Sequence, residues 1–120
     1  FNDTATTEIY TLSYTLSLHD ALPILLARRA SPVSHAASGL PPIITFHGTA
    51  DSLVPFGQAE EFDATMRRAG GAHLLVPVIG GGHGYENAEE RRRVRQFLDQ
   101  HLRGILSVIS TEPIPHPVKR

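Results

Sequence analysis

Two short segments of the chain carry residues whose types and spacing suit acid–base chemistry. In HGTADSLVP, residues 47–55, Asp51 follows a histidine by four positions. In GGGHG, residues 80–84, His83 is surrounded by glycines. A carboxylate that accepts the Nδ1 proton of a histidine fixes its tautomer and stabilises the imidazolium formed when the other nitrogen takes a proton. We therefore expect Asp51 and His83 to form a catalytic acid–base pair.

The same residues have other interpretations. His83 could be a loop histidine that water solvates, and Asp51 could simply bond the amides of its own turn, as aspartates often do. His47, Asp51 and His83 could together ligate a metal with one open position. The glycines could cradle a phosphate before a helix, although they match neither the dinucleotide pattern nor the P-loop pattern. The two motifs together favour the acid–base pair, for which we expect no metal and no cofactor.

Both motifs follow apolar segments that read as strands. Residues 43–47 (IITFH) and 72–79 (AHLLVPVI) are short, apolar and rich in β-branched residues, which is typical of buried strands. Each is followed by a helical pattern, over residues 56–68 and 87–104, so each crossover is long enough for parallel pairing. Sites in open α/β sheets lie at the carboxyl ends of the strands, where both motifs stand.

Local signals set the ends of these helices. Gly70-Gly71 is predicted to end the first helix, and Gly104 the second. Asn87 is predicted to cap the second helix, with Glu90 three residues later as the partner in a capping box.

Three further features carry predictions of their own. Pro77 indicates an edge position or a bulge in its strand. The segment EERRRVR, residues 89–95, reads as a solvated helix face. The apolar stripe of the second helix is predicted to be core and consists of Val94, Phe97, Leu98 and Leu102.

Composition limits the possible functions. The chain has 120 residues, a net charge of −1 and no cysteine. One domain at most is expected, and nothing in the charge argues for a nucleic acid or an anionic membrane. Without cysteine there is no disulfide, thiolate metal site or Cys nucleophile. No apolar run is long enough to cross a bilayer. Localisation and oligomeric state stay open.

The first 24 residues differ from the rest. They contain no Lys or Arg, and a YTLS unit occurs twice in succession. The stretches NDTATTEIYT and LSLHDALPI resemble a reading-frame translation of a common sequencing adapter, a match that covers nearly all of residues 2–24. We expect residues 1–24 to be non-native, so that no role is assigned to His19 or Asp20.

HGTADSLVP followed by GGGHG resembles the closing half of the α/β-hydrolase fold, above all its esterase, dienelactone-hydrolase and prolyl-oligopeptidase-like branches. The resemblance covers about residues 25–103. In that family a strand ends in HGxxD, and the next strand leads to a glycine-flanked histidine. The resemblance implies that Asp51 is the triad acid, that His83 is the triad base and that His47 is structural.

The chain departs from this family in lacking a nucleophile elbow. No G-x-S-x-G segment occurs, and Ala36 and Leu40 stand where Ser38 would need glycines. The family's serine precedes its acid and base, so we expect the nucleophile upstream of Leu25. Two strands cannot form an independent sheet of this kind. Residues 25–104 are therefore predicted to be the C-terminal part of an α/β-hydrolase domain, with residues 105–120 as an extended tail.

The parent protein is predicted to be a serine hydrolase of carboxylic esters. A prolyl-oligopeptidase-like serine peptidase and a non-catalytic binding or structural fragment are the alternatives. The expected partner is a small-molecule ester or peptide substrate, with no nucleic acid and no membrane. The chain as written is expected to be inactive because its nucleophile is absent.

Overall fold

The computed structural model describes residues 23–116. The chain divides into two compact units, residues 1–35 and residues 36–120. In the described part of the first unit, a helix over residues 23–30 is followed by a 3-10 turn, η1 (Pro32–His35). Apart from its last two residues, the segment predicted to be non-native lies outside the described residues, and so do His19 and Asp20.

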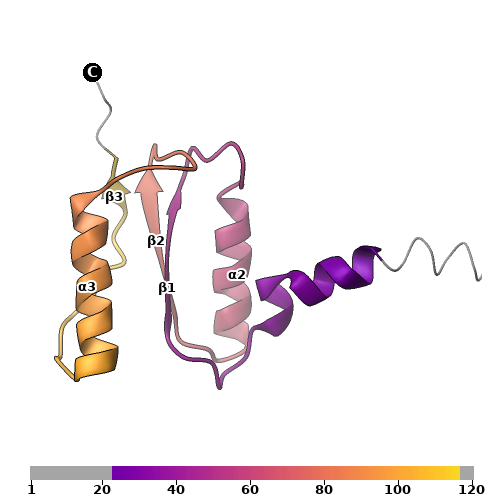
Figure 1. The fold of residues 1–120 in the computed structure, drawn as a ribbon, viewed down its shortest axis with the longest axis horizontal. Coiled ribbons are helices and arrows are strands. Elements are labelled where there is room, and N and C mark those ends of the chain that lie inside the picture. The colour runs from indigo at the N-terminus through magenta and orange to yellow at the C-terminus, as the bar shows by residue number, and fades with distance from the viewer. Residues whose placement is uncertain (1–22, 117–120) are drawn as a thin grey trace, which may run out of the picture. The chain divides into compact units, whose positions relative to one another are not determined.

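The second unit is a parallel sheet flanked by helices. The sheet has the order β1-β2-β3, and both pairs of neighbours run parallel. The helices α2 and α3 flank the sheet on opposite sides (Figure 1). The elements are, in chain order, β1 (Ile43–Gly48), α2 (Gly57–Arg68), β2 (His73–Ile79), α3 (Ala88–Arg103) and β3 (Ile114–Pro115). The predicted order strand, helix, strand, helix is confirmed.

The predicted helix ends are also found. Gly70, with φ 73°, and Gly104, with φ 67°, take the left-handed conformation that ends a helix. The Oδ1 atom of Asn87 accepts hydrogen bonds from the backbone N–H groups of Glu89 and Glu90, at 2.9 and 3.3 Å. The reciprocal half of the capping box is not formed in the described structure, because the Glu90 side chain lines a pocket instead.

The core lies against both faces of the sheet. Val76 and Val78 of β2 are fully buried, and Ile114 of β3 is 2% exposed beside Val78. On the α2 side, Met66 is fully buried. Each side chain of this size stabilises the folded state by roughly 1.5–3 kcal/mol when it leaves water.

The predicted number of strands needs correction. The tail contains a third strand, β3, so β2 lies between two partners. At Pro77, however, β2 pairs with β1 alone, so the edge position predicted for Pro77 holds on the β3 side. The Val78 carbonyl accepts from Thr49 on the β1 side, and the Ile79 carbonyl accepts from His116 on the β3 side. Because these directions alternate along a strand, the Pro77 nitrogen faces β3, where pairing begins only at Val78. Proline therefore removes no donor from the β1 ladder.

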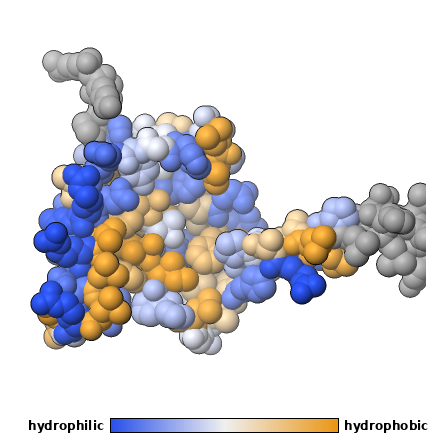
Figure 2. Space-filling view, in the orientation of Figure 1, coloured by the Kyte–Doolittle hydropathy of each residue, from blue (hydrophilic) through white to orange (hydrophobic). Residues whose placement is uncertain are grey.

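The outer surface of α3 also differs from the prediction. Arg93 lies in the segment expected to be solvated, but it is only 6% exposed. Conversely, Leu98 and Leu102 of the predicted core stripe are 47% and 77% exposed. Figure 2 shows apolar side chains gathered between α3 and α2, beside a hydrophilic outer side of α3. Across residues 23–116, none of the helices combines the length and apolar character needed to traverse a bilayer.

Candidate active site

The turn after β1 fixes the Asp51 carboxylate. Its Oδ1 atom accepts hydrogen bonds from the backbone N–H groups of Leu53 and Val54, both at 2.9 Å. This local pattern is typical of an aspartate that organises a turn, and the side chain is only 5% exposed. The turn engages one carboxylate oxygen and leaves the other available to a residue from elsewhere.

The second oxygen meets His83. The distance from His83 Nδ1 to Asp51 Oδ2 is 3.1 Å, across the carboxyl ends of neighbouring parallel strands. The His83 side chain is 55% exposed. With Nδ1 donating to the carboxylate, Nε2 is the ring nitrogen that can take up a proton. The structure thus brings the two predicted residues together.

His47 occupies the other side of Asp51. Its Nε2 atom lies 2.8 Å from the Val54 carbonyl and 3.4 Å from Asp51 Oδ2. Its ring also packs edge-on against Phe56, with centroids 5.8 Å apart. These contacts tie the turn to β1, in keeping with a structural role. Within residues 23–116 there is no group of three or more His, Cys, Asp or Glu side chains placed to hold a metal.

Hydrogen bonding keeps Asp51 ionised. The N–H of Val54 lowers the pKa of the Asp51 carboxyl most, and burial opposes this by raising it. The hydrogen bond with His83 and that with the Leu53 N–H lower the pKa further. The net effect is a pKa below the ordinary value, so the group is a carboxylate at neutral pH and can stabilise an imidazolium.

The glycines bring the two loops into contact. A Cβ at Gly48 would overlap the Gly81 carbonyl and lie 2.6 Å from the Gly82 oxygen. The N–H of Ala50 bonds the Gly81 carbonyl at 2.9 Å. Of the loop glycines, Gly80 has a positive φ, 74°. The absence of a side chain at Gly48 therefore lets the backbones of the two loops approach closely.

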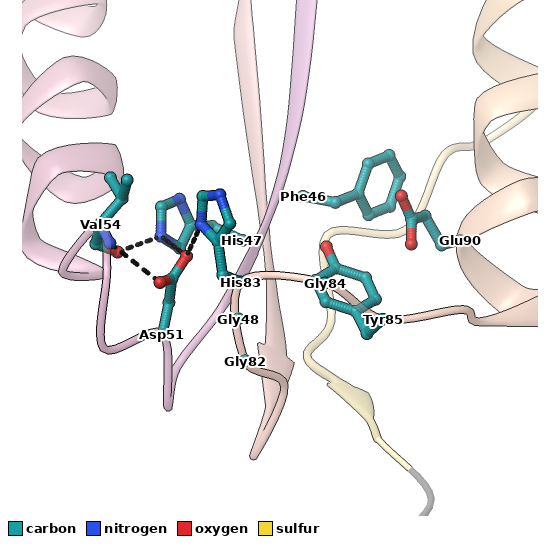
Figure 3. Close-up of a pocket in the computed structure, with 10 residues that line it drawn as sticks. All are labelled: Phe46, His47, Gly48, Asp51, Val54, Gly82, His83, Gly84, Tyr85 and Glu90. Carbon is teal, nitrogen blue, oxygen red and sulfur yellow. Dashed lines mark hydrogen bonds and ion pairs between the residues drawn. The ribbon is translucent and has the colours of Figure 1, made fainter.

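The pair opens onto a pocket. Its volume is about 390 Å³. Asp51, His47 and His83 lie on its α2 side and Phe46, Tyr85 and Glu90 on its α3 side (Figure 3). The lining residues are Phe46, His47, Gly48, Asp51, Val54, Gly82, His83, Gly84, Tyr85 and Glu90.

Sequence reasoning missed the α3 side of this pocket. Burial raises the pKa of Tyr85 to about 12, with a smaller contribution from the Glu90 charge. Burial also raises the pKa of Glu90, which the nearby Arg91 partly opposes. Two signals could have found these residues. Phe46 directly precedes His47 at the carboxyl end of its strand, and Tyr85 directly follows the GGGHG segment, residues 80–84.

A parallel sheet with flanking helices, and an aspartate–histidine pair where neighbouring strands end, are features of the α/β-hydrolase class. A profile of the prolyl oligopeptidase family matches residues 2–105, most of the chain. The chain belongs to the prolyl oligopeptidase family, and the resemblance to the α/β-hydrolase fold is confirmed. The matched range includes residues 2–24, whose non-native origin stays a prediction.

Several of the similar proteins carry esterase names. Esterase LipQ of Mycobacterium tuberculosis is 36% identical over 58 residues, which cover 48% of this chain and 14% of LipQ. Esterase LipC of the same organism is 34% identical over 60 residues, covering 49% of this chain and 15% of LipC. The apo form of Thermogutta terrifontis esterase 2 superposes with a TM-score of 0.56 at 36% identity, covering 68% of this chain and 33% of that structure. The chain thus spans a small part of the length of these relatives.

Proposed function

We propose that the chain supplies the acid and the base of a Ser-Asp-His triad in a serine hydrolase that cleaves carboxylic esters. The observation that carries this proposal is the 3.1 Å contact between His83 Nδ1 and Asp51 Oδ2 at the mouth of the pocket. The pair has the donor, the acceptor and a remaining ring nitrogen that the chemistry requires.

In the proposed reaction, a serine hydroxyl from the rest of the protein attacks the acyl carbon. His83 Nε2 takes the serine proton while Asp51 stabilises the resulting imidazolium. The tetrahedral intermediate collapses as His83 returns the proton to the leaving alcohol, which leaves an acyl-enzyme. Water then repeats the sequence and releases the acid and the free serine. No metal or cofactor enters this scheme.

The names of the similar proteins support an ester substrate rather than a peptide substrate. Two of the curated relatives, LipQ and LipC, are named esterases. Structures of Thermogutta terrifontis esterase 2 are described as phosphorylated by paraoxon and as bound to propionate and butyrate. Short-chain carboxylic esters are therefore the substrate class we propose. The family name itself favours the second candidate, a serine peptidase with the same triad.

The test begins with the DNA. Reading the source sequence across the codons for Ile24 and Leu25 shows whether a G-x-S-x-G segment lies upstream in frame. Continuation of the coding sequence as printed through residues 1–24, with no such segment further upstream, would contradict the proposal of an upstream serine and favour a non-catalytic fragment.

The whole protein is then assayed with p-nitrophenyl butyrate and with a prolyl peptide anilide. We expect ester turnover that falls by roughly 10⁶-fold in His83→Ala, whereas His101→Ala, an exposed histidine of α3, keeps full activity. Near-parental turnover in His83→Ala would refute the assignment. Faster cleavage of the peptide than of the ester would select the peptidase.

A further inference from the structure

The segment that follows α3 returns to the loop that carries His83. This loop runs from the end of β2, at Ile79, to the N-cap of α3, at Asn87. The backbone N–H of His116 bonds the Ile79 carbonyl at 3.0 Å. The Asn87 Nδ2 atom donates to the Pro115 carbonyl at 3.3 Å. The two residues that begin and end the loop are therefore bonded to adjacent residues of one segment.

A ring contact joins the same segment to the inside of the loop. The rings of Tyr85 and His116 meet edge-to-face, with centroids 6.0 Å apart and planes at 82°. Tyr85 stands two positions after His83. Two residues before His116, Ile114 is almost fully buried beside Val78. The loop thus contacts the returning segment at three points, and the apolar contact at Ile114 keeps that segment on the sheet.

Arg93 holds the returning segment at its other end. Its Nη1 atom donates to the carbonyls of Ser110 and Glu112, at 2.9 and 2.7 Å, and its Nε atom bonds Glu89 Oε1 at 2.8 Å. Residues 105–113 form no helix or strand, so these carbonyls are not paired within a helix or sheet and are free to accept from Arg93. Arg93 is only 6% exposed, and a buried guanidinium is costly unless it is paired. Here the pairing fixes where the chain turns back toward β2.

We propose that Arg93 is a positioning residue for His83, acting through the returning segment, residues 110–116. Arg93 binds the carbonyls of Ser110 and Glu112, and these hydrogen bonds position β3 against β2. Pro115 of β3 and the adjacent His116 then hold both ends of the loop. His83 makes its contact with Asp51 from the surface, with 55% of its side chain exposed. The orientation of the His83 ring therefore depends on the backbone of the loop. The importance of that orientation for catalysis rests on the proposed function, but the coupling between Arg93 and His83 does not.

The coupling can be measured on the 120-residue chain by NMR, without substrate. The readouts are the tautomer of His83, from its ring ¹⁵N shifts, and amide hydrogen exchange at His116. In Arg93→Ala we expect exchange at His116 to accelerate roughly 10- to 100-fold, and the His83 tautomer to move toward that of an unstructured peptide. Arg93→Lys keeps the charge but loses the planar guanidinium, so both readouts should lie between those of the parent chain and those of Arg93→Ala. Arg95→Ala, which removes an exposed arginine from the same helix, should change neither readout.

A second variant keeps the test decisive if Arg93→Ala does not fold. His116→Pro deletes the N–H that bonds Ile79 and leaves Arg93 in place, and it should shift the His83 tautomer in the same direction. Faster exchange at His116 with an unchanged His83 tautomer would make Arg93 purely structural and overturn the proposal. An effect of Arg95→Ala as large as that of Arg93→Ala would overturn it as well. Failure of the His83→Ala activity test would instead remove the proposed function and leave this coupling intact.

Discussion

Replacing Gly48 with alanine should separate the two halves of the site. Gly48 ends β1, and its Cα faces the backbone of the glycine loop. A Cβ there would lie 2.6 Å from the Gly82 oxygen, and ordinary contact begins near 3.4 Å. The obstacle is backbone and not the end of a flexible side chain. The Gly82 oxygen must therefore retreat by about 0.8 Å, the difference between these distances, and the closer Gly81 carbonyl must retreat further.

This displacement is large compared with the tolerance of a hydrogen bond. A retreat of His83 by the same amount would stretch its 3.1 Å contact with Asp51 to about 3.9 Å, beyond hydrogen-bonding range. The 2.9 Å bond from Ala50 N–H to the Gly81 carbonyl would be strained as well. Overpacking of this kind costs about 1–3 kcal/mol. We expect Gly48→Ala to lower the free energy of unfolding by that amount. We also expect the His83 tautomer to shift toward that of an unstructured peptide.

Urea denaturation and the ring ¹⁵N shifts of His83 measure the two effects. Gly84→Ala is the matched control, because it adds the same methyl group to the His83 loop. Gly84 has no positive φ, and no atom lies within 4 Å of its added Cβ. That variant should keep both the stability and the tautomer. If Gly48→Ala also kept both, the contact between the two loops would not position the pair and the reasoning would be refuted.

Three further outcomes follow from burial and charge. Because hydrogen bonds lower the pKa of Asp51 in the folded state, its stabilisation is present at neutral pH and is lost as the pH falls below about 4; urea denaturation of Asp51→Asn should lack that part of the profile. The raised pKa of Tyr85, about 12, means that stability falls as the pH rises above about 10; NMR titration should show a lower Tyr85 pKa in Glu90→Gln. Met66→Ala should cost about 2–5 kcal/mol in urea because Met66 is fully buried, whereas Leu106→Ala, at a 93% exposed position, should stay within about 0.5 kcal/mol.

The convergence of Asp51 and His83 was predictable from sequence because it depends on topology. Parallel strands place their carboxyl ends at one edge of a sheet, so two loops after two successive strands meet there. Helix ends were predictable for a similar reason. Gly104 and Asn87 act on neighbours within one turn of the helix, and their chemistry is local.

The role of Arg93 could not be predicted in this way. Arg91, Arg92, Arg93 and Arg95 are the same residue type on one helix, and no local pattern distinguishes the buried one. Burial of Arg93 depends on carbonyls 17 and 19 positions away. Those carbonyls lie in a proline-rich segment. Its strand, β3, has only two residues, and its prolines argue against predicting a strand there. Glu90 was misassigned for a related reason, since its side chain turns from the cap toward a pocket that the folded chain creates.

The contacts that orient the pair come from this part of the chain. Asp51 is held by the amides of its own turn, and His83 reaches it from a loop that packs against Gly48. These partners all lie in the second unit of the chain. In the proposed triad the acid and the base would be supplied as an oriented pair, and the serine would have only to meet the Nε2 atom of His83. Orientation of the pair, measured by the His83 tautomer, and turnover, measured with an ester, are therefore separate quantities. The first can be tested in this chain without a substrate.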